Sequence, residues 1–214
     1  MGRTRISIND YTLFKDEISF LSDKTTMTKE RILWENSNPK FRGVLLIAIK
    51  KHIKKIKSES LSKNQKVVKE IKLNDKLEDK EINLIFQFLK EIETIDLRDT
   101  AIESLEILAF FEKIEVLSIS ENPIITLDGI ESLKKLRKLF CINTEIETVE
   151  NLKNCKNLQE LYCAKNQIKS LESLSKNEKL ILINCRKTLI TKKEVGKFLK
   201  SKPNCNVIRK GFLF

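Results

Sequence analysis

The stretch from Leu117 to Ile124 reads Leu-Ser-Ile-Ser-Glu-Asn-Pro-Ile, and a second stretch, from Leu161 to Ile168, reads Leu-Tyr-Cys-Ala-Lys-Asn-Gln-Ile. Both begin with alternating apolar residues, continue to an asparagine, and end on an isoleucine. The alternation indicates a short strand with one buried face. The asparagine indicates a turn in which its side chain satisfies backbone groups.

The pattern recurs every 22 residues in five units. Four apolar positions keep the same phase in every unit: Ile92, Ile114, Leu136, Leu158 and Leu180; Ile95, Leu117, Leu139, Leu161 and Ile183; Leu97, Ile119, Cys141, Cys163 and Cys185; Ile102, Ile124, Ile146, Ile168 and Ile190. No unit can bury its apolar face alone, so neighbouring units share one core. We therefore predict an α/β solenoid over residues 67–208, with one curved parallel sheet on its concave face. A less regular first unit is expected at 71–73, followed by a longer helix over 79–90.

The pattern resembles the 22-residue leucine-rich-repeat class of the nuclear regulatory subunit of protein phosphatase 1. The resemblance covers residues 92–190 and rests on the two stretches quoted above. It implies a solenoid that acts by binding another macromolecule. Proteins that share this fold serve unrelated functions, so the resemblance names no particular partner.

Both ends of a solenoid need caps. Residues 1–66 are predicted to form a basic helical segment, either a cap or a separate module, with helices at about 10–21, 28–35 and 39–57. At the other end, Thr191 is expected to cap a helix that stops before Pro203, and residues 205–208 to form an edge strand. The apolar tail, 209–214, either folds back or serves as a docking peptide.

Charge is concentrated at the two ends of the chain, whose net charge is +11. Residues 1–66 carry 15 Lys and Arg against 7 Asp and Glu, and residues 181–214 carry 9 against 1. The predicted helix at 39–57 has lysines beside its apolar stripe: Lys50, Lys51, Lys54, Lys55 and Lys57. Three interpretations of this segment stay open: a solvated cap, a contact with nucleic acid or an acidic partner, and a degenerate F-box suggested by Ile18–Leu21 with Trp34 downstream.

Residues for catalysis or metal binding are sparse. The single histidine, His52, lies in the lysine-rich helix without partners at ligand spacing, and the five cysteines show no CxxC pair. Three of them, Cys141, Cys163 and Cys185, should point inward as free thiols. We expect no enzyme activity, metal, cofactor or small-molecule substrate. The longest apolar run, 44–49, is too short to span a membrane, and no export signal is visible, which favours a cytoplasmic or nuclear location.

The candidate binding residues are those strand and turn positions that point away from the core. They are Asp96, Arg98, Ser118, Glu121, Phe140, Ile142, Tyr162, Lys165, Asn184 and Arg186. Phe140, Ile142 and Tyr162 should form an exposed apolar patch, and aromatic side chains are favoured anchors in protein interfaces. The turn position that follows each strand changes from acidic to basic along the array: Asp75, Asp99, Glu121, Asn143, Lys165 and Lys187. This change would orient a partner with a complementary charge distribution.

The sequence thus predicts a non-enzymatic adaptor or regulatory subunit that binds a protein partner through the concave face, within a larger complex. The alternative is a subunit of a ribonucleoprotein or other nucleic-acid complex whose basic ends contact phosphate. A leucine-rich-repeat protein of the U2 spliceosomal particle is one precedent. An F-box-like adaptor is a minor alternative.

Overall fold

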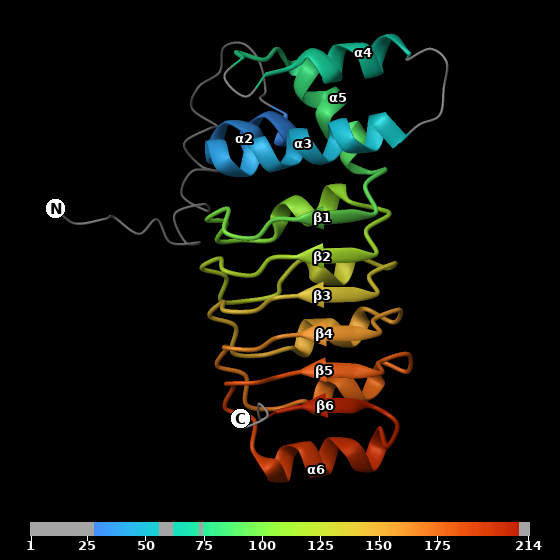
Figure 1. Ribbon diagram of the computed structural model, residues 1–214. Coiled ribbons are helices and arrows are strands. Elements are labelled where there is room, and N and C mark those ends of the chain that lie inside the picture. The colour runs from blue at the N-terminus through green and yellow to red at the C-terminus, as the bar shows by residue number, and fades with distance from the viewer. Residues whose placement is uncertain (1–27, 56–61, 73–74, 210–214) are drawn as a thin grey trace, which may run out of the picture.

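A single parallel sheet runs along the whole repeat region. The computed structural model describes residues 28–55, 62–72 and 75–209. Its six strands lie side by side in chain order (Figure 1): β1 Thr94–Asp96, β2 Val116–Ser118, β3 Lys138–Phe140, β4 Glu160–Tyr162, β5 Leu182–Asn184 and β6 Asn206–Ile208. Each of the first five strands pairs in register with the residue 22 positions away, as Ile95 does with Leu117. The 22-residue period of the sequence therefore equals the separation in sequence between paired residues on neighbouring strands.

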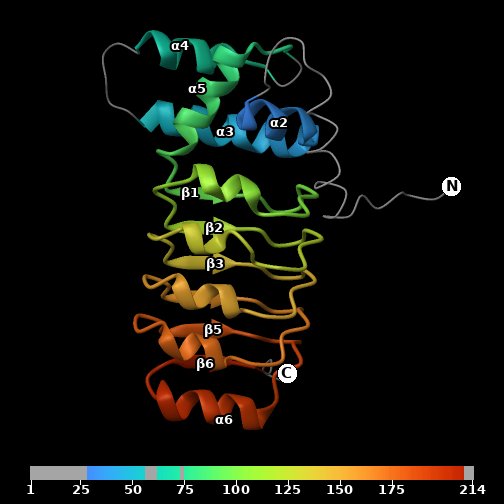
Figure 2. The same cartoon turned by 180° about the vertical axis from the view of Figure 1, so that it is seen from behind.

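The convex side is built from short 3-10 helices, which lie behind the sheet (Figure 2). They are η1 Glu106–Phe110, η2 Ile130–Ser132, η3 Glu150–Asn154 and η4 Glu172–Lys176. The predicted apolar columns are buried between this layer and the sheet, and they form one continuous core with the end caps. The predicted α/β solenoid with a parallel sheet is confirmed as a fold, and its first strand begins at Thr94.

The turns after the strands hold a buried hydrogen-bond ladder. The amide of Asn122 donates to the carbonyl oxygens of Leu97, Ile119 and Ser120, and its oxygen accepts from the backbone N–H of Thr100 at 3.0 Å. Asn166 links the turn after β4 to the turn after β3 in the same way. Each asparagine thus ties its own turn to the preceding one, as the motif predicts.

At one shared position of each turn the residue adopts a left-handed backbone, with φ between 52° and 59°: Asp99, Glu121, Asn143, Lys165 and Lys187. In the first turn Ala101 adopts it as well, with φ at 55°. None is glycine, so each of these residues adds a small conformational free-energy cost, which the hydrogen bonds of the turns offset. This conformation was not predictable from residue type alone, because Glu and Lys seldom adopt it, although Asp and Asn do so more often.

The N-terminal cap contains four described helices, α2 Lys29–Asn36, α3 Pro39–Lys55, α4 Lys63–Glu70 and α5 Asp79–Leu89. They cover the β1 end of the stack (Figure 1). The helices expected at 28–35, 39–57 and 79–90 are confirmed to within two residues, and the one expected at 10–21 lies outside the described residues. Trp34 is buried in this cap at 4% exposure. Its ring lies below Arg42, so it serves as cap core here.

The predicted division at residue 66 falls inside α4, and a further helix, α5, comes before the first strand. Ile71 and Lys72 are not in a strand, and Leu73 lies outside the described residues. The strand expected at 71–73 is therefore not found, because Ile71 is buried within the helical cap instead. Whether the segment is a separate module stays a prediction.

The C-terminal end follows the prediction. Helix α6, Lys192–Ser201, begins after Thr191, whose hydroxyl oxygen accepts from the N–H of Glu194 at 3.2 Å. The chain then returns as β6 at the edge of the sheet. The tail from residue 210 lies outside the described residues.

Candidate partner-binding face

The sheet face opposite the 3-10 helices, which we call the outer sheet face, carries a stacked aromatic pair. Phe140 on β3 pairs in register with Tyr162 on β4. Their rings are 4.5 Å apart between centroids and 8° from parallel. Neighbouring strands are separated by about 4.8 Å, so two flat rings in one column stack without distortion. Both side chains are half-buried.

A polar network holds the second ring in place. The hydroxyl of Tyr162 donates to Glu160 at 2.8 Å, and Glu160 forms an ion pair with Lys138 at 2.8 Å. The Lys138 ammonium is the main reason that the pKa of the Glu160 carboxyl is lowered. The hydrogen bond to Glu160 raises the pKa of the Tyr162 phenol.

This network was not among the predicted site residues, because its members Lys138 and Glu160 belong to a further outward column. The residues of this column stand just before the central inward position of each strand: Thr94, Val116, Lys138, Glu160 and Leu182. Strand alternation places them on the same face as Phe140 and Tyr162. The signal was therefore present in the sequence.

The outward column that contains Ser120 and Ile142 is less exposed than expected. Ser120 is buried at 4%, and its hydroxyl oxygen accepts a hydrogen bond from the N–H of Ile142 at 3.0 Å. Ile142 is half-buried and follows Phe140 on the same face, so it adjoins the aromatic pair. Ser118 and Asn184 flank the pair in register on β2 and β5.

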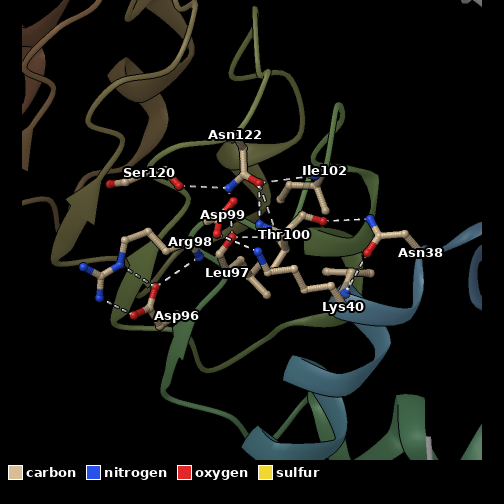
Figure 3. Close-up of polar contacts among 11 residues, drawn as sticks. Asn38, Lys40, Asp96, Leu97, Arg98, Asp99, Thr100, Ile102, Ser120 and Asn122 are labelled. Atoms are coloured by element: carbon tan, nitrogen blue, oxygen red, sulfur yellow. Dashed lines mark hydrogen bonds and ion pairs between the residues drawn. The ribbon is translucent and has the colours of Figure 1, made fainter. Parts of the chain in front are cut away.

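The acidic residues at the β1 end are engaged with cations of this chain (Figure 3). Asp96 pairs with Arg98 at 2.6 Å, and Asp99 pairs with Lys40 of α3 at 2.6 Å. The pair with Arg98 lowers the pKa of Asp96. Glu121, one unit further, is exposed. Within the acidic part of the expected turn column, Lys40 therefore compensates Asp99, whereas Glu121 remains exposed.

Comparison with protein-family models found no match, and comparison with curated proteins found none either. Among solved structures, internalin C2 of Listeria monocytogenes is similar, with 23% identity and a TM-score of 0.54 over 59% of this chain. A leucine-rich-repeat protein of Leptospira interrogans is 17% identical with a TM-score of 0.46, and the match covers 58% of this chain and 38% of that one. The Drosophila melanogaster SNF/U2A′ complex is 20% identical with a TM-score of 0.46, and the match covers 54% of this chain and 71% of that one.

The fold is a leucine-rich-repeat solenoid. This chain spans 55% of the length of internalin C2, and at this level of identity the similarity concerns the fold alone. None of these structures is the phosphatase regulatory subunit, so that finer resemblance stays a prediction.

The lysine-bearing helix α3 lies in the cap beyond β1, away from the aromatic pair on β3 and β4 (Figure 1). Lys50 is half-buried, and its ammonium donates to the carbonyl oxygen of Ile71 at 2.6 Å, which makes it part of the cap's packing. Lys51 and Lys54 are exposed. The side chain of Lys55 and all of Lys57 lie outside the described residues.

The cysteines of the solenoid are buried as free thiols. Burial raises the pKa of Cys141 to about 12 and that of Cys185 to about 11, and it raises the pKa of Cys163 well above its usual value. Within residues 28–55, 62–72 and 75–209, no three His, Cys, Asp or Glu side chains gather where they could hold a metal ion. In the same ranges, no helix has the length and hydropathy needed to cross a bilayer.

Proposed function

We propose that this solenoid is a non-enzymatic adaptor or regulatory subunit that binds a protein partner through its outer sheet face. The stacked pair Phe140 and Tyr162 carries the proposal. Covering apolar rings that remain partly accessible in the middle of a sheet removes them from water, which makes partner binding more favourable. Aromatic side chains of this kind are common energetic centres of interfaces.

The pair is already fixed before a partner arrives. The rings pack on each other, and the Tyr162 hydroxyl is anchored to Glu160. Side chains that are ordered in advance lose little conformational entropy on binding, so more of the contact energy contributes to affinity. This arrangement supports a role in recognition.

The arrangement also favours a protein over a nucleic acid as the partner on this face. Single-stranded nucleic acid is held largely by bases that stack on open aromatic faces. Here the two rings stack on each other, so one face of each ring is already occupied and is not available to a base. The nucleic-acid alternative depends instead on the basic ends, where Lys51 and Lys54 are exposed.

The deciding experiment compares partner binding by the wild-type chain, Phe140→Ala and Tyr162→Phe. Partners are first isolated from the native cell with and without nuclease, and their affinities are then measured at two salt concentrations. Loss of an aromatic anchor should cost about 2 kcal/mol, or more than tenfold in affinity. Tyr162→Phe keeps the ring and should lose much less. Normal binding by a folded Phe140→Ala variant would place the partner elsewhere, and binding abolished by nuclease would favour the nucleic-acid alternative.

A further inference from the structure

The turns after β4 and β5 carry three cations at the edge of the outer sheet face. We call these residues, Lys165, Arg186 and Lys187, the basic rim. The backbone N–H of Lys165 donates to the carbonyl oxygen of Arg186 at 2.8 Å, so the two turns are in direct contact. Arg186 comes two residues after Asn184, which pairs with Tyr162. The basic rim therefore adjoins the aromatic pair.

The basic rim has no internal counterions in the part of the chain that the structure describes. Every ion pair found there joins other residues, and the two cations near the opposite end of the face, Lys40 and Arg98, are both paired. Arg137 and Lys138, in the middle of the sheet, are paired as well. The uncompensated positive charge on this face thus lies at its β4–β5 end.

Arg186 gives a second sign of an absent acceptor. Its Nε atom is buried and has no hydrogen-bond partner. A buried N–H donor without an acceptor carries a free-energy cost, and an incoming acceptor relieves it only if the Arg186 side chain turns outward to expose the Nε atom. A guanidinium also binds carboxylates through paired hydrogen bonds, which makes it more selective than a lysine.

From these observations we infer that the outer sheet face takes an acidic segment of a protein partner. An apolar side chain of the segment covers Phe140 and Tyr162, and Asp or Glu residues beside it pair with the basic rim. The inference rests on the proposed function and adds the chemistry and the orientation of the partner. Charge complementarity of this kind selects partners and fixes their direction on the surface.

The test is selection of random displayed peptides against the immobilised full chain, with a random single-stranded RNA pool selected in parallel. The variants are Arg186→Gln and the double variant Lys165→Gln/Lys187→Gln. Lys176→Gln is the control, because Lys176 is an exposed lysine of η4 on the convex side. The double variant keeps the test open if Arg186→Gln does not fold. Phe140→Ala reports on the proposed function separately.

We expect the enriched peptides to contain more Asp and Glu than the unselected library. Each rim variant should bind a selected peptide about tenfold more weakly at low salt, and the control should bind normally. Peptides that need Phe140 but are not acidic, or that ignore the rim variants, would overturn this inference and leave the proposed function standing. No enrichment, or enrichment independent of Phe140, would overturn both. Selection of RNA alone through the basic rim would also overturn the inference.

Discussion

The side-chain amide of Asn38 donates a 2.7 Å hydrogen bond to the backbone carbonyl oxygen of Thr100, at the junction of the helical cap and the first repeat (Figure 3). The oxygen of the same side chain accepts from the N–H of Phe41 at 2.9 Å, which caps the first turn of α3. One asparagine therefore begins the helix and docks it on the first turn of the solenoid. Its two roles can be separated by mutation.

We expect Asn38→Ala to lower the free energy of unfolding by about 1–3 kcal/mol, because it removes both the helix cap and the inter-element bond. Asn38→Asp keeps an acceptor for the N–H of Phe41 but loses the donor to Thr100. Denaturant unfolding and hydrogen exchange of α3 measure the effect. If Asn38→Asp is as stable as the wild type, the bond to Thr100 contributes nothing.

Asn122 should be among the most sensitive buried polar positions. Its side chain satisfies backbone groups in two turns, including the N–H of Thr100 and the carbonyl oxygen of Leu97. Asn122→Ala leaves these groups buried without partners, so we expect a loss of about 3 kcal/mol or more. The control is Thr188→Ala, which removes a hydroxyl that donates to the carbonyl oxygen of Cys185 and accepts a long bond from the N–H of Ile190, and it should cost about 1 kcal/mol. Equal melting temperatures for the two variants would contradict the ladder's role.

Adjacent residues of β3 should respond oppositely to truncation. Leu139 is fully buried, and Leu139→Ala should destabilise the fold by about 2–5 kcal/mol. Phe140 lies on the outer sheet face, so Phe140→Ala should cost much less stability while it weakens partner binding. Leu161 and Tyr162 form the matching pair on β4. Thermal unfolding of the four alanine variants decides the matter, and a larger loss for Phe140→Ala than for Leu139→Ala would be inconsistent with the strand orientation.

Thiol labelling of the native protein should be slow at Cys141 and Cys163. Both are fully buried, and burial raises the pKa of Cys141 to about 12, so little reactive thiolate forms near neutral pH. Cys205 lies at the edge strand at 6% exposure and should react first of the five. Mass spectrometry of labelled peptides over time gives the order. Rapid labelling of Cys141 without unfolding would show that the core opens locally.

The pKa of the Tyr162 phenol should fall toward its usual 10.0 in the variant Glu160→Gln, because the carboxylate acceptor that raises it is removed. In a Tyr11→Phe background Tyr162 is the only tyrosine, and its ionisation is followed by ultraviolet absorbance. A raised phenol pKa means that this bond stabilises the fold below the usual value and is lost as the pH rises through the raised one. An identical titration in Glu160→Gln would show that the hydrogen bond is absent in solution.

Much of the outer sheet face was predictable from strand alternation. The sequence placed Phe140 and Tyr162 side by side because they share a phase of the repeat, and the same rule would have included Lys138 and Glu160. It did not predict that Ser120 is buried, because its hydroxyl turns back to the N–H of the next strand. Nor did it predict the ion pair of Asp99, whose partner Lys40 is distant in sequence.

The sequence by itself determined the stacking of the repeats, since a strict 22-residue period leaves in-register parallel pairing as the arrangement that buries every apolar column. Only the tertiary structure decided which charges remain free. Lys40 and Lys50 look alike in a list of basic residues, yet the first neutralises Asp99 and the second bonds the carbonyl oxygen of Ile71. Arg186, by contrast, keeps an unpaired donor. Local periodicity fixes which face a side chain occupies, whereas its partner depends on which distant segments pack beside it.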